Sequence, residues 1–240
     1  MSVNTILASP SSSLTDDWRK AAKLIDHTLL KPDATSKQVI ALCADAAQYH
    51  FFSVMVNPAN VSLAAAQVRD TTVKVGTVVG FPLGANLTVT KIAEAEAVLR
   101  NGAQELDMVI NIGALKSGDR TLVQAEIRSL AQLAHYSGAI LKAILENALL
   151  TQEEKILACA LAMDAGADFV KTSTGFAGSG ATLADVALMR GVVGHRLGVK
   201  AAGGIRTLAQ FLDMVDAGAN RIGTSTSVEI MRELGAASDV

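Results

Sequence analysis

The 240-residue sequence lacks several features that mark secreted and membrane proteins. Its 2 cysteines, Cys43 and Cys159, lie far apart and form neither a CxxC pair nor a disulfide framework. We therefore expect two buried thiols in the reducing environment of the cytoplasm. No apolar stretch approaches the roughly 18 uninterrupted residues of a membrane helix, and the N-terminus has no basic segment followed by an apolar core. Neither a membrane span nor a secretory signal is predicted.

An excess of positive charge is also absent. The chain has 21 Lys and Arg residues against 23 Asp and Glu residues, a formal net charge of −2, and no basic run. We therefore expect no nucleic-acid partner and no attachment to an anionic membrane surface. Because 50% of the residues are hydrophobic, the chain can bury a sizeable core, and global disorder is excluded.

Motifs for metal and serine-hydrolase chemistry are missing as well. The four histidines, at positions 27, 50, 135 and 195, are scattered and make neither an H-x-H nor an H-E-x-x-H pattern. There is no G-x-S-x-G sequence. We therefore expect no metal and no cofactor. His27 lies in a predicted strand and could reach a site, but a buried core position or a dimer contact explains it better.

A Gly-Ala pair recurs before short apolar or β-prone runs, which indicates a repeated unit. The pairs are Gly102-Ala103, Gly138-Ala139, Gly166-Ala167 and Gly218-Ala219. A glycine at a helix end can adopt the left-handed conformation that turns the chain into the next strand. The pairs therefore predict alternating helices and strands.

Helix starts are predicted at threonines whose side chains can accept from the first free N–H groups. Three form capping boxes with a Gln or Glu three residues later. These are Thr35-x-x-Gln38, Thr151-x-x-Glu154 and Thr207-x-x-Gln210, and Thr88 and Thr182 are further candidates.

Eight strands are predicted, and a helical pattern follows each of them. The strands lie near residues 23–30, 51–56, 73–81, 105–112, 139–146, 169–174, 198–203 and 221–225. Eight strand–helix units in this length predict an α/β fold of the TIM-barrel or (β/α)₈ type, as a single domain over residues 18–240. Residues 1–17 are Ser-rich and read as a poorly ordered lead-in. An open doubly wound sheet is the alternative, weakened because no G-x-G-x-x-G follows the first strand.

Three lysines fall within predicted strands, where charged side chains are rare. Lys142, Lys171 and Lys200 are evenly spaced, so we expect them at equivalent positions on three consecutive strands. One of them could instead face the helices and extend its ammonium group to solvent. That explanation serves one lysine better than three.

Carboxylates are available to balance these lysines: Asp26, Asp107 and Glu146 lie on the first, fourth and fifth predicted strands. A buried cluster of lysines and carboxylates can separate pKa values and leave one amine neutral. A neutral lysine beside another cation is a nucleophile suited to Schiff-base formation with a carbonyl. A purely structural ion-pair network would also shift pKa values and stays the alternative.

Glycines follow the last two predicted strands, in Gly203-Gly204 and in Gly223-Thr224-Ser225. Glycines let the backbone approach an anion, and the loops after strands 7 and 8 are the usual phosphate site of these barrels. A glycine pair alone is often only a turn, but two such loops together indicate a phosphate group on the ligand.

Six segments resemble the deoxyribose-phosphate aldolase family, in the family's order, from about residue 20 to about residue 230. They include LIDHTLLKP and VGFPLG near the start, and ELDMVIN, VKTSTGF, VKAAGGIR and RIGTS further on. A single Gly-Gly would carry little weight, whereas six motifs in order are highly specific.

The resemblance implies a class I aldolase that reversibly cleaves 2-deoxy-D-ribose 5-phosphate to D-glyceraldehyde 3-phosphate and acetaldehyde, without a cofactor. It implies that Lys171 is the Schiff-base nucleophile, that the charge of Lys200 lowers the pKa of Lys171, and that Asp107 transfers protons. The remaining roles that it implies are support from Asp26, Lys142, Glu146 and Thr174, and phosphate binding by Gly175, Gly203, Gly204, Gly223 and Ser225. A homodimer is usual in the family.

Three positions depart from the family pattern. Met55 stands where members often carry Cys, and because a thioether cannot add to an aldehyde as a thiolate can, we expect greater tolerance of reactive aldehydes. Asn147 stands where Thr is common. The tail ends in Ala-Ser-Asp-Val, without the tyrosine that reaches the site in some members.

Two other functions remain open from the residues alone. An isomerase or synthase on a phosphate-binding barrel would keep the glycine loops but would need no set of three lysines. A non-catalytic barrel that senses sugar phosphates would bind the ligand without turnover. The lysines together with Asp107 favour the aldolase over both.

Overall fold

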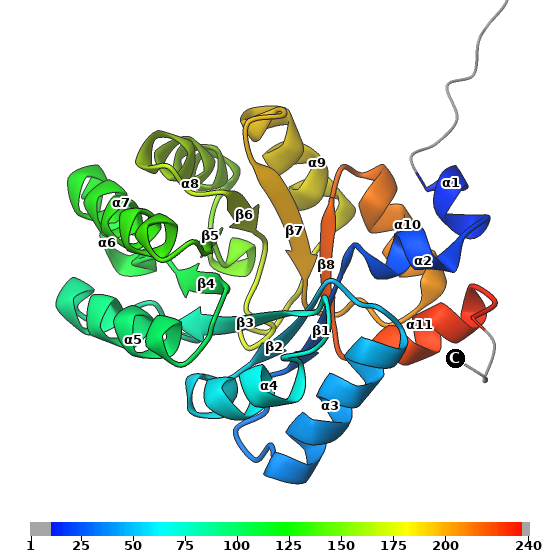
Figure 1. Cartoon of the computed structure of the whole chain (residues 1–240). Helices are drawn as coiled ribbons and strands as arrows, with labels where there is room; N and C mark the ends of the chain where they lie inside the picture. Colours follow the sequence, from blue (N-terminus) through cyan, green and yellow to red (C-terminus); the bar gives the residue numbers. More distant parts are fainter. Residues whose placement is uncertain (1–10, 237–240) are drawn as a thin grey trace, which may run out of the picture.

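The computed structural model of the chain describes residues 11–236, in which eight parallel strands close into a barrel (Figure 1). Each strand pairs with the next, and β8 pairs with β1. The strands are β1 (Ile25–Leu29), β2 (Ser53–Val56), β3 (Lys74–Val79), β4 (Glu105–Val109), β5 (Ile140–Ile144), β6 (Phe169–Lys171), β7 (Gly198–Ala202) and β8 (Arg221–Thr224). The predicted (β/α)₈ barrel is confirmed. Closure between β1 and β8 excludes an open doubly wound sheet.

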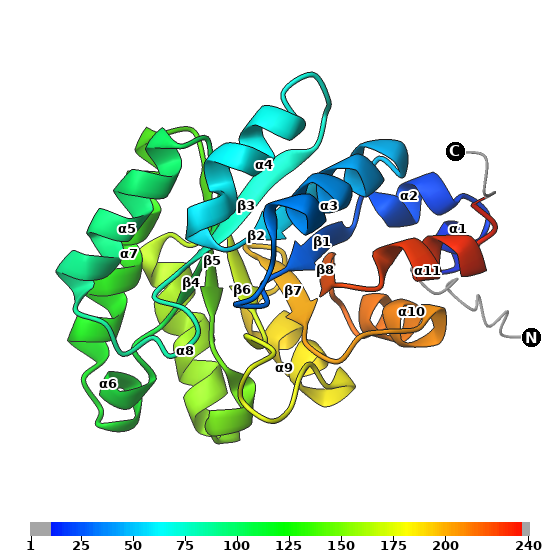
Figure 2. The ribbon, with the colours of Figure 1, turned by 90° about the horizontal axis from the view of Figure 1, so that it is seen from below.

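Helices follow every strand and surround the barrel (Figures 1 and 2). They are α3 (Ser36–Gln48), α4 (Val61–Gln67), α5 (Thr88–Arg100), α6 (Ile112–Lys116), α7 (Arg120–Tyr136), α8 (Gln152–Ala165), α9 (Leu183–Val193), α10 (Leu208–Asp216) and α11 (Ser227–Glu233). The link from β4 to β5 carries two helices, α6 and α7. Within residues 11–236, none of the helices has both the length and the apolar character that crossing a membrane requires.

The helix starts follow the capping pattern of the sequence. The three predicted capping boxes form at the starts of α3, α8 and α10, and the Thr182 side chain accepts from the N–H of Asp185 at the start of α9. The predicted cap at Thr88 is wrong. Thr88 is the first residue of α5, and its hydroxyl donates to Glu126 on α7 instead of accepting from its own helix.

The Gly-Ala pairs mark the passage from a helix to the next strand, as predicted. Gly166 ends α8 with a φ of 85°, in the left-handed region. The N–H of Ala167 then donates to the carbonyl of Ala162 in the last turn of α8. A residue with a Cβ would be strained at Gly166, so glycine fixes where the chain leaves the helix.

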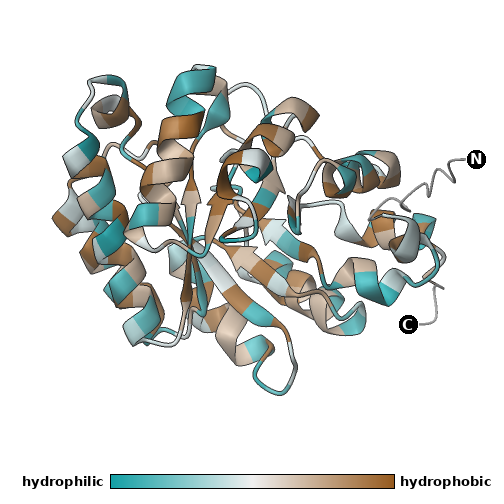
Figure 3. Cartoon of the chain, turned by 90° about the horizontal axis from the view of Figure 1, so that it is seen from above, coloured by the Kyte–Doolittle hydropathy of each residue, from teal (hydrophilic) through white to brown (hydrophobic). Residues whose placement is uncertain are grey.

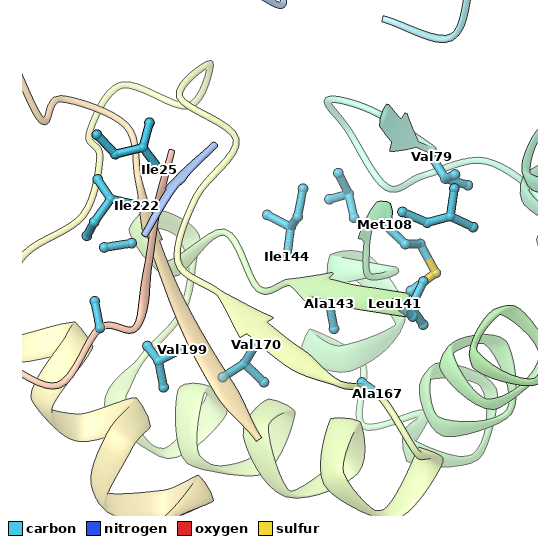
Figure 4. Close-up of a cluster of buried hydrophobic side chains, with 14 of the residues drawn as sticks. Ile25, Val79, Met108, Leu141, Ala143, Ile144, Ala167, Val170, Val199 and Ile222 are labelled. Carbon is cyan, nitrogen blue, oxygen red and sulfur yellow. The ribbon is translucent and has the colours of Figure 1, made fainter. Parts of the chain in front are cut away.

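Alternate residues of each strand face the helices and form the main hydrophobic core. Val170 and Val199 are fully buried on that side, next to the surrounding helices (Figure 4). Their neighbours Lys171 and Lys200 therefore face the inside of the barrel. Figure 3 shows the same division over the whole molecule, with apolar residues concentrated on the strands and polar residues frequent on the outer faces of the helices.

The N-terminal segment differs in part from the predicted lead-in, of which residues 1–10 lie outside the described residues. Residues 11–17 include the short helix α1 (Ser12–Thr15) and lead into α2 (Trp18–Ala22). Ser11 donates to the Asp216 carboxylate at the end of α10, and Leu14 is buried. This segment is therefore docked beside α10, where Figure 1 shows it, rather than poorly ordered.

One ion pair in the helical layer is completely buried. The Lys91 ammonium group on α5 lies 2.7 Å from the Glu126 carboxylate on α7 and 2.8 Å from the carbonyl oxygen of Val109, which ends β4. Both side chains have an exposed fraction of 0%. The pair therefore ties two helices to the strand between them.

Replacing Glu126 with alanine is expected to destabilise the fold strongly, because it leaves the Lys91 ammonium group buried without its carboxylate. We expect a loss of about 3–5 kcal/mol in the free energy of unfolding, measured by guanidinium denaturation. Glu96→Ala is the matched control, since Glu96 forms an exposed pair with Arg100 on α5, and a loss below about 0.5 kcal/mol is expected. Equal losses in the two variants would contradict a special role for the buried pair.

Candidate active site

A cavity of about 320 Å³ opens at the carboxyl ends of the strands. The loops after β1, β6, β7 and β8 line it, together with residues of the strands themselves. The lining includes Lys171, Lys200, Thr174, Gly175, Gly203, Gly204, Gly223 and Ser225. Eight of the site residues predicted from the sequence thus lie around one cavity, at the end of the barrel where active sites of this fold occur.

Asp107 on β4 joins the three lysines below the cavity. Its Oδ2 atom accepts from Lys171 Nζ and from Lys200 Nζ, each at 2.8 Å. Its Oδ1 atom accepts from Lys142 Nζ at 2.8 Å. All four side chains are almost inaccessible to solvent, with exposed fractions from 0% to 3%. The predicted clustering of these lysines with Asp107 is confirmed.

The three lysines are not at equivalent depths, contrary to the prediction from their spacing. Lys171 pairs in register with Lys200, whereas Lys142 pairs with Phe169, two residues nearer the start of β6. Lys142 therefore lies deeper in the barrel and does not line the cavity. The reason is the stagger of the strands, which an even sequence spacing does not reveal.

A second set of charges lies around Lys142 and reaches further from the cavity. Lys142 Nζ lies 2.6 Å from a Glu105 carboxylate oxygen, and the Arg221 guanidinium group donates to both Asp26 and Glu105 at 2.8 and 3.0 Å. Lys200 also forms an ion pair with Asp26. Asp26 was predicted to support the site and does contact its lysines.

Glu105 and Arg221 are the members that sequence reasoning missed as site residues. A signal for both was present, because each lies two residues from an assigned position, Asp107 or Gly223, on the same strand. Residues two apart on a strand share a face. Alternation therefore places both side chains inside the barrel.

The electrostatics differ sharply between the lysines. Burial lowers the pKa of Lys171 to about 8, and the charges of Lys200 and Lys142 act in the same direction while Asp107 opposes them. Burial also disfavours the charged form of Lys142, but Asp107, Glu105 and Asp26 together raise the pKa of Lys142 above its usual value. Lys171 is thus the amine that loses its proton most readily of these two.

The carboxylates stay ionised despite their burial. Burial alone would raise the pKa of Asp107, but Lys142, Lys171 and Lys200 hold it well below its usual range. Asp26 behaves in the same way beside Lys200, Lys142 and Arg221, which hold its pKa well below the usual value. The cluster can therefore offer one neutral amine next to a fixed negative charge and a cation.

Glu146 lies apart from the lysine cluster and organises the loop after β6. It has a φ of 57°, which is unusual for a residue with a Cβ. Its buried carboxylate accepts from the N–H of Thr174 at 3.2 Å and from the Thr174 hydroxyl. Thr174 in turn accepts from the N–H of Phe176 at 3.0 Å. Both predicted supporting residues thus shape the cavity wall.

The glycines after β6 and β7 bring two backbones together beside the cavity. Gly203 and Gly175 have φ values of 87° and 85°. A Cβ added to Gly203 would lie 3.0 Å from the Cα of Gly180 and 3.4 Å from that of Gly175. The loops therefore pack without side chains between them, which leaves backbone groups free to face a ligand.

The departures from the family pattern fall in different places. Met55 is buried and lines the cavity. A side chain at this position can meet an aldehyde in the cavity, as the expected tolerance of reactive aldehydes requires. Asn147 lies outside the lining, and its amide donates to Met189 on α9. His27 does not reach the site; it faces the helices and is hydrogen-bonded to Ser227 at 2.9 Å. The tail at residues 237–240 lies outside the described residues.

Among residues 11–236, no group of three or more His, Cys, Asp and Glu side chains is placed to hold a metal ion. The carboxylates inside the barrel are instead paired with lysine and arginine side chains.

Comparison with known proteins agrees with the geometry of this site. The family model for DeoC/LacD family aldolase matches residues 20–237. The chain belongs to this aldolase family. It is 58% identical over 212 residues to deoxyribose-phosphate aldolase of Thermococcus gammatolerans, which covers 88% of this chain and 94% of that protein.

Two further relatives extend the comparison. The deoxyribose-phosphate aldolase of Staphylococcus epidermidis is 54% identical over 91% of this chain and 98% of its own length. A solved structure of deoxyribose phosphate aldolase from Aeropyrum pernix, described as tetrameric, superposes with a TM-score of 0.85 at 34% identity, covering 91% of this chain and 92% of that one. This aldolase-family chain is therefore matched over nearly its whole barrel.

Two lysine variants of this aldolase-family chain are expected to change stability in opposite directions at pH 7. Because burial disfavours the charged form of Lys171, stability rises with pH between about 8 and 10.5, and the full penalty is present below about 8. Lys171→Met is therefore expected to raise the free energy of unfolding by about 1–3 kcal/mol.

Lys142→Met serves as the matched comparison. Its ammonium group balances Asp107, Glu105 and Asp26, so its loss is expected to destabilise the fold by about 3–5 kcal/mol. Urea denaturation at pH 7 measures both changes. A loss of stability in Lys171→Met as large as that in Lys142→Met would refute the difference between the two amines.

Proposed function

We propose that this chain is a class I aldolase that reversibly cleaves 2-deoxy-D-ribose 5-phosphate to D-glyceraldehyde 3-phosphate and acetaldehyde. The observation that carries this proposal is the state of Lys171. Its amine lines the cavity, its pKa is lowered to about 8, and it lies 2.8 Å from the Asp107 carboxylate. The names of the close relatives supply the substrate.

The proposed reaction begins at the Lys171 amine. Its lone pair attacks the aldehyde carbon C1 of the open-chain substrate, and loss of water gives an imine. The C3 hydroxyl then loses its proton, and the C2–C3 bond breaks to release glyceraldehyde 3-phosphate. The bonding pair moves to C2 and the imine nitrogen, which forms an enamine. Protonation at C2 and hydrolysis of the resulting imine release acetaldehyde and restore the amine.

Lys200, as a cation, and Asp107, as an anion, support these steps. Lys200 also lines the cavity, and its ammonium group favours the neutral form of Lys171. Asp107, which holds both amines, accepts the proton of the C3 hydroxyl through a water molecule in the proposed cycle. Positioned groups of this kind contribute about 10²–10⁴-fold in rate. The covalent intermediate needs no metal or other cofactor.

The remaining predicted residues surround the substrate in this proposal. The phosphate group would lie against the backbone of the three glycine-containing loops that follow β6, β7 and β8. These loops contribute Gly175, Gly203, Gly204, Gly223 and Ser225 to the cavity. Asp26, Lys142, Glu146 and Thr174 hold the catalytic side chains and the β6 loop in position. We expect the partners of the chain to be small-molecule substrates, without a nucleic acid or a membrane.

We also propose a homodimer in the cytoplasm. A two-fold dimer is the commonest oligomer of soluble enzymes. The location is supported by Cys43 and Cys159, which are free and buried. Burial raises the pKa of these two thiols to about 11 and about 12, respectively. Such thiols are unreactive and persist reduced in that compartment.

Reductive trapping tests the identity of the nucleophile. Acetaldehyde and borohydride are added to the native enzyme, and the modified peptide is mapped by mass spectrometry. We expect one N-ethyl group, on Lys171, and none in Lys171→Met, because the imine is reduced where it forms. Lys200→Met is the control for the second amine in the cavity and should still be trapped at Lys171 at high pH.

Each other outcome has a defined meaning. Modification mainly at Lys200 or Lys142 would overturn the role of Lys171 while the imine chemistry stands. A folded protein that is never trapped would overturn the class I mechanism and favour the imine-free enzyme or the binding protein.

A glycine variant tests the phosphate site. Gly203→Ala pushes the β7 loop away from Gly180 and Gly175, so kcat/KM for deoxyribose 5-phosphate is expected to fall about 10–100-fold through lost backbone bonds to the phosphate. The value for unphosphorylated 2-deoxyribose should change less than about threefold. Gly138→Ala is the control, because Gly138 is also left-handed but has no neighbour within 4 Å of an added Cβ. Equal losses on both substrates would refute phosphate binding at this loop.

A further inference from the structure

The charged side chains inside the barrel form one closed network with an unequal number of acids and bases. Within residues 11–236 it joins four basic and three acidic side chains through ion pairs. Its members are Asp26, Glu105, Asp107, Lys142, Lys171, Lys200 and Arg221. If every member is ionised, the buried network carries one net positive charge. If one lysine is neutral, the charges balance.

Arg221 is the basic member of the network that has no ion pair with Asp107. It does not line the cavity, and its guanidinium group donates to Asp26 at 2.8 Å and to Glu105 at 3.0 Å. Its Cζ atom lies 3.5 Å from the ring centroid of Phe52 and 5.3 Å from that of Phe169. A Cβ at Gly198 would collide with the Phe169 ring, so glycine at that position makes room for the stack.

These contacts keep Arg221 charged and fixed. Cation–π contact with two rings and charge-assisted bonds to two carboxylates stabilise the ionised form. Arg221 and its carboxylate partners Asp26 and Glu105 are all buried. An arginine also loses its proton far less readily than a lysine. When the network reaches electroneutrality, the proton must therefore leave a lysine.

Lys171 is the lysine that releases this proton. Lys142 contacts Asp107 and Glu105, and Asp26 lies near it. Lys200 contacts Asp26 and Asp107. Lys171 has an ion pair with Asp107 alone among the described carboxylates, so it has the fewest carboxylate partners of the three lysines.

Other charged groups around the barrel lie outside this network. Lys31 and Arg206 are on exposed loops at the mouth of the cavity, Lys74 begins β3 and is exposed, and Glu146 is buried against Thr174. Solvent and salt screen the three exposed groups, whereas they screen the buried ones far less. The buried network therefore dominates the charge balance at Lys171.

We propose that Arg221 is a positioning residue for catalysis: its fixed charge, paired with Asp26 and Glu105, keeps Lys171 in the neutral, nucleophilic form. Arg221 thus acts through the network and never contacts the substrate. The opposing member is Glu105, whose negative charge favours a protonated Lys171. This inference rests on the proposed role of Lys171 as the imine-forming amine.

The test is the pH dependence of kcat/KM for deoxyribose 5-phosphate, which reports the ionisation of the free enzyme. In the wild type, activity should rise with pH with a midpoint near 8, because the neutral amine attacks. Removing a buried positive charge should move this rise to higher pH by about one unit in Arg221→Met. Glu105→Gln, which is nearly isosteric, should move it to lower pH by about one unit.

Two more variants separate charge from packing. Arg221→Met/Glu105→Gln removes one charge of each sign, so the rise should return to within about 0.3 pH unit of the wild type, even if the maximal rate is lower. Arg221→Lys keeps the charge and should keep the position of the rise. Arg100→Met on the exposed face of α5 is the control for a distant arginine and should not move it.

A merely structural role predicts a different pattern. Loss of packing would lower kcat at every pH, without opposite shifts for opposite charges, and the double variant would be worse than either single one. Unmoved profiles, or shifts in the same direction for Arg221→Met and Glu105→Gln, would overturn the proposal. If Arg221→Met does not fold, Glu105→Gln and the double variant still decide the question.

Failure of this inference is distinguishable from failure of the proposed function. Reductive trapping at Lys171 with unmoved pH profiles would overturn only the role of Arg221. Trapping at another lysine would overturn the assignment of the nucleophile itself.

Discussion

The interior of this barrel depends on a single carboxylate, that of Asp107, held between three ammonium groups. A TIM barrel is usually filled by layers of branched apolar side chains. Here the layers nearest the cavity are ionic, and each buried charge would cost several kcal/mol without a partner. Asp107, on β4, is the partner of Lys142 on β5, of Lys171 on β6 and of Lys200 on β7. The same contact therefore holds the barrel together and places an amine next to a carboxylate and a second amine.

Much of this architecture could be predicted from the sequence, because it is encoded locally. Threonine capping boxes and Gly-Ala pairs mark where helices begin and end, and the alternation of strands placed Lys171 and Lys200 on the inside. The Thr88 cap failed because Thr88 bonds to Glu126, a residue on another helix. Contacts between elements can override a local preference in this way, and a local sequence pattern does not predict such contacts.

The candidate site was less completely predictable, and the reason is again non-local. The depth of Lys142 depends on the stagger between β5 and β6, which the spacing of lysines along the chain does not contain. Glu105 and Arg221 are visible as charged residues in strands, but their role depends on which side chains face them across the barrel. Glu146 has a left-handed backbone and its carboxylate contacts Thr174 in the loop after β6, and residue types alone do not reveal this contact.

The close approach of the β6 and β7 loops has a consequence for how such a site can diversify. The backbones of Gly175, Gly180 and Gly203 lie against one another with no side chain between them, and a Cβ at Gly180 would collide with the Gly203 carbonyl. A change of length or residue type in one loop therefore displaces the other. The two loops therefore behave as one structural unit, and a new ligand shape at this wall requires paired changes in both of them.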